Sequence, residues 1–130
     1  MKLYISILLI IIGLSLSPIS AKPFYCKSSL ITIDLVDGNG YGKWMECESD
    51  IVVDFENRQI TIYNTDTQTF NIEYCSLTEY KHYSVIGCFT ADNNNKTCIL
   101  KIFVYNDGNI YVKIEYNHII YKYKVKRYDL

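Results

Sequence analysis

The sequence predicts an all-β protein, built as an antiparallel up-and-down meander of eight or nine strands that forms a closed or partly closed barrel. Three observations point to this fold. The composition favours strands over helices, because the chain has thirteen tyrosines and many isoleucines, threonines and valines but little alanine. Apolar and polar residues alternate with a period of two in short runs. Clusters of Asn, Asp and Gly separate these runs, as in a chain of hairpins.

The alternating runs define the expected strands. They lie near residues 29–36, 43–48, 50–55, 59–63, 67–75, 80–89, 97–105, 109–117 and 119–127. None of these runs has the periodicity of an amphipathic helix. A series of hairpins leaves two unpaired edge strands, and closing the sheet on itself removes both edges. We therefore expect a barrel, with a two-sheet sandwich as the alternative.

Three turns predict how neighbouring strands are aligned. They lie at residues 106–108, where Gly108 supplies the left-handed conformation, at 117–118 and at 56–57. The turns place these residues opposite each other: Val104 and Ile110, Ile102 and Val112, Leu100 and Ile114, Tyr116 and Ile119, Ile114 and Tyr121, Val112 and Tyr123, Val53 and Ile60, and Ile51 and Ile62. The apolar residues of the last three strands then share one face, as a common core requires.

The five cysteines suggest disulfide bonds. A loop centred on Asn93 places Cys88 opposite Cys98 on neighbouring strands, at a separation that a disulfide can span. We predict a Cys88–Cys98 disulfide. The other three cysteines then form one further bridge and leave one unpaired thiol, with the pairing open: Cys26, Cys47 and Cys75.

The N-terminal segment predicts export. Residues 1–21 have the layout of a signal peptide, because Lys2 precedes an apolar run and the small residue Ala21 follows it. Cleavage there leaves residues 22–130 as a single all-β domain. No lipobox precedes Cys26, so we expect a soluble periplasmic or extracellular product rather than a lipoprotein. The alternative, an uncleaved anchor, is disfavoured because the run is shorter than the roughly 20 apolar residues that a membrane span needs.

Several strand segments share their pattern with a group of known proteins. These segments are Asp50–Tyr63, Thr67–Ile72, Cys88–Asp92, Cys98–Leu100, Ile110–Val112 and Tyr121–Val125. Over residues 43–127 the chain resembles small exported β-proteins of uncharacterised function from Bacteroidetes. The resemblance implies export and a β fold, and it implies no catalytic activity. The segment before Trp44 and three of the cysteines depart from the pattern.

One outer face is the leading candidate for a binding site. The chain is acidic before residue 98 and basic after it. The predicted register places Lys101, Lys113 and Lys122 in one outward row, and Phe103, Tyr111 and Lys124 in the next. Like charges directly opposite each other in a sheet are destabilising, so a bound anion would offset the row. The alternative is a solvated face whose lysines prevent edge pairing.

Taken together, these features predict an exported, non-enzymatic binding protein. No catalytic residue, metal or cofactor is assigned. The expected partner is an anionic polysaccharide or envelope surface, or another exported protein, rather than nucleic acid. Trp44 is expected to plug one end of the barrel.

Three alternatives stay open. The first is an apolar ligand inside the barrel, in a cavity lined by Tyr116, Tyr121 and Tyr123. The second is an interaction or inhibitor protein that presents loop 37–42 or loop 91–96. The third is an enzyme that uses a Cys75–His82 dyad.

Overall fold

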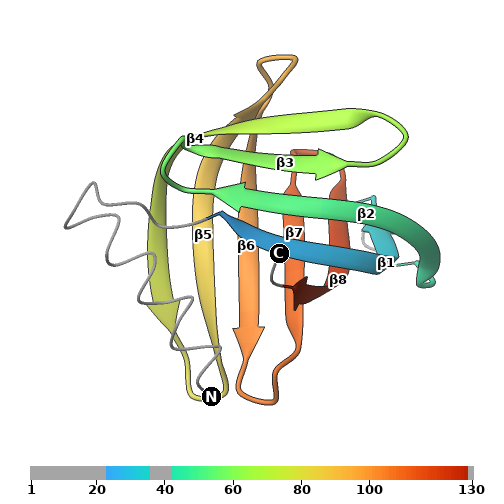
Figure 1. Cartoon of the computed structure of the whole chain (residues 1–130), viewed down its shortest axis with the longest axis vertical. Helices are drawn as coiled ribbons and strands as arrows, with labels where there is room; N and C mark the ends of the chain where they lie inside the picture. Colours follow the sequence, from blue (N-terminus) through green and yellow to red (C-terminus); the bar gives the residue numbers. More distant parts are fainter. Residues whose placement is uncertain (1–22, 36–41, 129–130) are drawn as a thin grey trace.

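The computed structural model describes residues 23–35 and 42–128, and in them it shows a closed barrel of eight antiparallel strands (Figure 1). The strands are β1 (Phe24–Asp34), β2 (Met45–Asp54), β3 (Gln59–Tyr63), β4 (Thr67–Glu79), β5 (Tyr83–Asp92), β6 (Thr97–Tyr105), β7 (Ile110–Glu115) and β8 (Ile120–Tyr128). Each strand pairs with the next, and β1 pairs with β8. The barrel is therefore confirmed over the sandwich. The predicted signal peptide, residues 1–21, lies outside the described residues.

The described residues contain no helix long and apolar enough to cross a membrane.

The strand count is eight because the two runs predicted at 43–48 and 50–55 are one strand, β2. Ser49 interrupts the apolar alternation in the sequence, yet it faces Ser28 in the β1–β2 ladder, directly beside an irregularity in that ladder. Its side chain is almost fully buried and donates a hydrogen bond to Oδ1 of Asn64. A satisfied polar residue can thus occupy an inward position without ending the strand.

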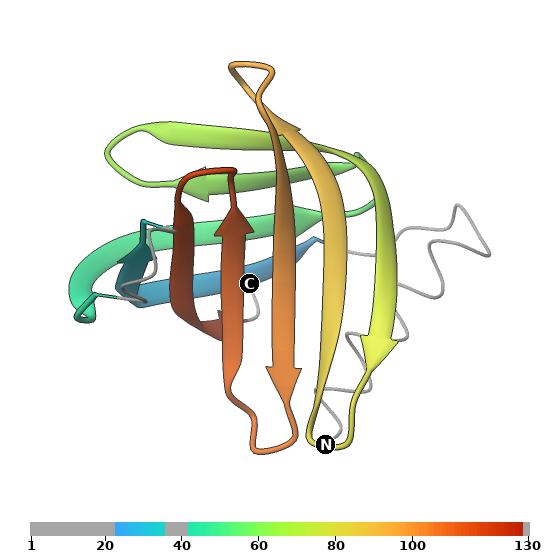
Figure 2. The same ribbon diagram turned by 180° about the vertical axis from the view of Figure 1, so that it is seen from behind.

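The register predicted from the three turns is confirmed. Residues Ile102 and Val112 face each other between β6 and β7. The same holds for Ile114 and Tyr121 between β7 and β8, and the β2–β3 pairs also match. Figure 2 shows β5 to β8 side by side from behind. Their inward residues join those of β1 to β4 in one buried core, whose largest members are Phe70, Ile51, Ile60, Ile62, Ile86, Leu100, Ile102, Ile110 and Ile114.

The register predicted between β5 and β6 is wrong by two residues. Cys88 faces Leu100, and Cys98 faces Thr90. The expected loop is centred one residue too early, because it is Asn95 that adopts the left-handed conformation, with a φ of 63°. Asparagine tolerates this conformation better than most residues. The predicted Cys88–Cys98 disulfide therefore loses its geometric basis, and all five cysteines are free thiols in this structure.

The turn at residues 93–95 has the same backbone hydrogen bonds as the turn at residues 106–108. In each, the N–H of the last strand residue, Asp92 or Tyr105, donates to the carbonyl oxygen of the first residue after the turn, Lys96 or Asn109. The left-handed residue then donates its own N–H to the carbonyl oxygen of that last strand residue. Gly108 (φ 95°) holds the left-handed position in the second turn, where glycine has no steric penalty. Asn95 is its counterpart in the first turn.

A β-bulge changes which side chains of β4 face the core. Phe70 and Ile72 point inward before the irregularity, and Cys75 and Leu77 pack against the core after it. A bulge adds one residue to a strand and so reverses the alternation beyond it. Cys75 consequently faces inward, opposite Cys88 on β5.

Arg58, in the turn between β2 and β3, forms two hydrogen bonds with the backbone of this bulge. Its carbonyl oxygen accepts a hydrogen bond from the N–H of Ile72 at 2.9 Å. Its Nη1 donates to the carbonyl oxygen of Glu73 at 3.3 Å. The bulge is therefore tied to the adjacent hairpin.

We predict that Asn95→Val lowers the free energy of unfolding by about 1 to 2 kcal/mol, because a β-branched residue is strained in the left-handed conformation. Asn95→Gly should leave the stability unchanged or raise it. Urea denaturation followed by far-UV circular dichroism measures both. Asn93→Val is the matched control in the same turn, and an equal loss there would contradict the assigned conformation.

Candidate ligand site at the barrel mouth

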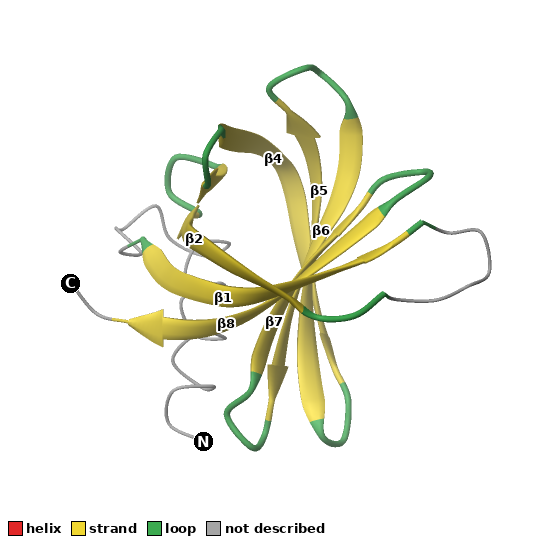
Figure 3. Cartoon of the chain, turned by 90° about the vertical axis from the view of Figure 1, so that its right-hand side faces the viewer, coloured by secondary structure: helices red, strands yellow, loops and turns green. Residues whose placement is uncertain are grey.

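Alternate hairpin turns gather at one end of the barrel. Because consecutive strands run in opposite directions, the turns after β1, β3, β5 and β7 share an end. Figure 3 shows the turns at the ends of the strands. The described turns that contribute most are residues 64–66, 93–96 and 116–119. We call this end the mouth.

Two adjoining pockets open at the mouth. The mouth pocket has a volume of about 720 Å³ and is lined by Gln68, Asp92, Asn94, Asn95, Lys96, Thr97, Tyr116, Asn117, His118, Ile119 and Tyr121. The inner pocket has a volume of about 240 Å³ and is lined by Asn64, Thr65, Asp66, Gln68, Phe70, Ile114, Tyr116, Tyr121 and Tyr123. Three residues line both: Gln68, Tyr116 and Tyr121. The inner pocket reaches the core, since Phe70 and Ile114 are buried.

Asp92 is the charged centre of the mouth pocket. Its side chain, in a residue only 8% exposed, accepts hydrogen bonds from the N–H groups of Asn94 and Lys96 at 2.9 Å. It also accepts a 2.8 Å hydrogen bond from the hydroxyl of Tyr116. Burial acts to raise the pKa of this carboxyl, but these hydrogen bonds outweigh it and the pKa is lowered. Asp92 is therefore an ionised acceptor at neutral pH.

The carboxylate of Asp92 fixes the ring of Tyr116 between the two pockets. Burial, and then the hydrogen bond to Asp92, raise the pKa of the Tyr116 hydroxyl. The ring of Tyr116 meets that of Tyr121 edge to face, with 6.4 Å between the centroids. Two aromatic surfaces thus meet at right angles where the pockets join.

The inner pocket has a polar contact at its buried side. Tyr123 is 4% exposed and its side chain hydrogen-bonds Asn64, while burial raises the pKa of its hydroxyl. Oδ1 of Asn64 in turn accepts a hydrogen bond from the hydroxyl of Ser49. These two contacts hold the side chain of Tyr123, which belongs to β8, against the turn after β3.

The structure brings Tyr116, Tyr121 and Tyr123 together around one pocket, as the interior-ligand alternative expected. Sequence reasoning missed Gln68 and Asp92. A usable signal existed, because in a meander the turns after alternate strands share one end. That rule places the polar turns at 64–66, 93–96 and 117–118 next to one another.

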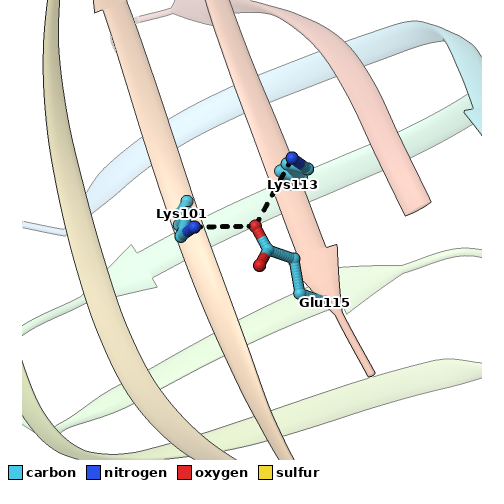
Figure 4. Close-up of polar contacts among 3 residues, drawn as sticks. All are labelled: Lys101, Lys113 and Glu115. Carbon is cyan, nitrogen blue, oxygen red and sulfur yellow. Dashed lines mark ion pairs between the residues drawn. The ribbon is translucent and has the colours of Figure 1, made fainter. Parts of the chain in front are cut away.

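The outward lysine row has the predicted register but contains its own counter-ion. Lys101 faces Lys113, and Lys113 faces Lys122. Oε2 of Glu115 lies 2.9 Å from Nζ of Lys101 and 3.5 Å from Nζ of Lys113 (Figure 4). Each of these side chains is at most one third exposed. The repulsion between Lys101 and Lys113 that suggested a bound anion is therefore offset within the protein, whereas the charge of Lys113 still acts on Lys122.

The next outward row, Phe103, Tyr111 and Lys124, also has the predicted register. Its rings contact the lysines: Nζ of Lys122 lies 4.8 Å from the ring centroid of Tyr111. Burial, and then the charge of Lys113, lower the pKa of Lys122. The ring of Tyr111 thus favours the charged form of Lys122, whereas burial and the neighbouring Lys113 oppose it.

Trp44 does not plug the barrel. Its ring lies 6.3 Å from that of Tyr111, an outward residue, and it is 43% exposed. The physical reason is that β2 begins at Met45, so Trp44 belongs to the connection outside the sheet.

The Cys75–His82 dyad is not formed. His82 lies in the exposed turn after β4, whereas the thiol of Cys75 contacts that of Cys88 in the barrel wall. Of the proposed inhibitor loops, residues 91–96 form the end of β5 and part of the mouth pocket. Residues 37–41 of loop 37–42 lie outside the described residues.

Comparisons of the chain with family models, curated proteins and solved structures give no match. Within residues 23–35 and 42–128, no group of three or more His, Cys, Asp or Glu residues is arranged to hold a metal ion.

We predict that Asp92→Asn lowers the free energy of unfolding by about 1 to 2 kcal/mol at neutral pH, because three hydrogen bonds lose their charged acceptor. Because the pKa of Asp92 is lowered in the folded state, its contribution is present above the ordinary value of 3.8 and is lost as the pH falls below it. The difference between wild type and variant should therefore shrink as the pH falls below 3.8.

Urea denaturation at a series of pH values measures this difference. Asp107→Asn is the control, because Asp107 accepts the same kind of backbone hydrogen bond in an exposed turn, while its other carboxylate oxygen accepts from the side-chain amide of Asn109 rather than from a tyrosine hydroxyl. A difference between wild type and Asp92→Asn that does not change with pH would contradict the assigned role.

We predict that Glu115→Gln lowers the free energy of unfolding by about 1 kcal/mol at low ionic strength, because Lys101 and Lys113 then repel each other without a counter-ion. The loss should diminish in about 1 M salt, which screens the repulsion. Thermal unfolding at both ionic strengths tests this. Glu46→Gln, at an exposed position on β2, is the control, and a salt-independent loss at Glu115 would exclude repulsion as the cause.

Proposed function

We propose that this protein is a non-enzymatic binding barrel that holds a small hydroxyl-rich ring compound, such as a terminal sugar of a glycan, in the mouth pocket. One observation supports this above the others. A pocket of about 720 Å³ combines side-chain amides and one ionised carboxylate with tyrosine rings. This volume lies in the range of roughly 300 to 1,000 Å³ typical of small-ligand sites.

The chemistry of the lining matches such a ligand. Each amide side chain presents both donors and an acceptor, which suits hydroxyl groups that also do both. Gln68 offers such an amide to both pockets, and Asn94 and Asn117 offer others at the rim. The perpendicular rings of Tyr116 and Tyr121 supply flat apolar surface for the face of a sugar ring.

A wholly apolar ligand fits less well. The barrel below the mouth is filled by buried aliphatic residues, and the inner pocket of about 240 Å³ is smaller than a typical ligand site. An eight-stranded barrel is just wide enough for its own side chains to fill. An apolar molecule would also displace water from the polar side chains of the rim without replacing the lost hydrogen bonds, which costs free energy.

The outward lysine row of Lys101, Lys113 and Lys122 is the second place where an anionic glycan or envelope surface would bind. Glu115 already neutralises part of its charge, so we rank it below the mouth. Export to a compartment with glycans is the prediction from residues 1–21, and it is consistent with either site. The resemblance to exported Bacteroidetes proteins also stays a prediction.

The test is isothermal titration calorimetry with a panel of neutral monosaccharides and disaccharides, and with heparin as the anionic probe. We expect a neutral saccharide to bind, and Gln68→Ala and Tyr121→Ala each to weaken binding by about tenfold, the loss of about one good contact. Lys122→Ala is the control and should leave the affinity unchanged.

Two outcomes would overturn the proposal. One is that no neutral saccharide binds at millimolar concentration. The other is that heparin alone binds, that salt weakens its binding steeply, and that Lys122→Ala abolishes it while Gln68→Ala does not. The second outcome would assign binding to the outward lysine row instead.

A further inference from the structure

Two cysteines face each other directly across neighbouring strands. Cys75 on β4 and Cys88 on β5 are paired in the antiparallel ladder. Directly paired residues have Cα atoms about 4.5 to 5.5 Å apart, which is within the range that a disulfide bridges. Both side chains point to the barrel interior, so their sulfur atoms lie on the same side of the sheet.

The two thiols already interact, and they differ in accessibility. A hydrogen bond joins them, and it lowers the pKa of Cys75, with a smaller contribution from the charge of Arg58. The same contact, together with burial, raises the pKa of Cys88. Cys88 is fully buried, whereas Cys75 is partly exposed. Cys75 is thus the thiol that a reagent in solution meets first.

The other cysteines have different neighbours. The sulfur of Cys98 lies 3.1 Å from the hydroxyl of Thr90, and that of Cys47 lies 3.7 Å from the hydroxyl of Ser28. Cys26 is buried and faces Ile51. Among the described residues, the Cys75–Cys88 pair is the one in which two cysteines occupy paired positions of the ladder.

From this placement we infer that Cys75 and Cys88 are a redox-active pair that forms a cross-strand disulfide. The oxidant is a small disulfide such as oxidised glutathione. The Cys75 thiolate attacks one sulfur of the oxidant, forms a mixed disulfide and releases one glutathione thiolate. The released thiolate takes up from water the proton that Cys75 gave up. The sulfur of Cys88 then attacks that of Cys75 and expels the second glutathione, which leaves with the proton that Cys88 loses. Two protein thiols are oxidised, and one oxidant is reduced to two thiols.

The geometry assigns Cys88 the second step. A buried thiol that glutathione cannot reach still reaches the neighbouring sulfur, because that attack occurs within the molecule. If the predicted export is correct, the mature chain meets an oxidising compartment in which such a bond persists. The bond would link β4 to β5 immediately beyond the β4 bulge.

The test is to incubate the purified folded protein with oxidised glutathione, alkylate it after unfolding, and map disulfide-linked peptides by mass spectrometry. We expect two of the five thiols to escape alkylation, and one disulfide-linked peptide pair to join Cys75 to Cys88. The denaturant midpoint should rise on oxidation. In the reduced folded protein, a maleimide should label Cys75 before Cys88.

Two variants sharpen the result. Cys75→Ser should abolish both the linked peptide and the shift in midpoint, whereas Cys98→Ser, the control, should keep both. Should Cys75→Ser not fold, the peptide map of the wild type decides alone. Finding Cys75 and Cys88 both alkylated, a lasting mixed disulfide on Cys75, or Cys88 linked to Cys98 would overturn the inference.

Discussion

The ladder between β1 and β8 closes the barrel, and both the common core and the mouth exist because of it. It extends from Tyr25 opposite Tyr128 to Asp34 opposite Ile120. Without it, the first and last strands would each present a row of unpaired backbone groups. Closure also turns one face of every strand inward, so that the alternating apolar residues of distant strands share one core. The mouth exists because closure brings the turns after alternate strands into a ring.

Bulges then decide which polar residues enter that interior. In β1 the irregularity between Ser28 and Leu30 leaves Ser28 buried, where its hydroxyl donates to the carbonyl groups of Leu30 and Lys124. In β4 the irregularity after Ile72 turns Cys75 inward. Each bulge is satisfied locally by hydrogen bonds, so the barrel tolerates the break in alternation. The cysteine pair is therefore a result of a local backbone irregularity rather than of simple alternation.

Charge is balanced inside the protein on both faces of the sheet. On the outer face, Glu115 lies between two lysines that the register forces together. At the mouth, Asp92 is held by two backbone N–H groups and the hydroxyl of Tyr116. Partly buried charges require such partners, because desolvation is otherwise costly. The difference between the two sites is shape, since the mouth is hollow and the lysine row lies along a strand surface.

The amino-acid sequence alone predicts the all-β class, the meander and the register wherever a glycine or a short turn marks the hairpin, as at Gly108. Those features depend on local alternation and turn chemistry, which a single strand and its neighbour contain. The register around Asn95 was not determined, because an asparagine run allows the left-handed residue at several positions. Three contacts emerge only in the folded barrel: Glu115 pairs with Lys101 and Lys113, Cys75 meets Cys88, and Gln68 and Asp92 line one pocket. Those contacts depend on side-chain reach, on a bulge and on closure, which join residues that local patterns do not relate.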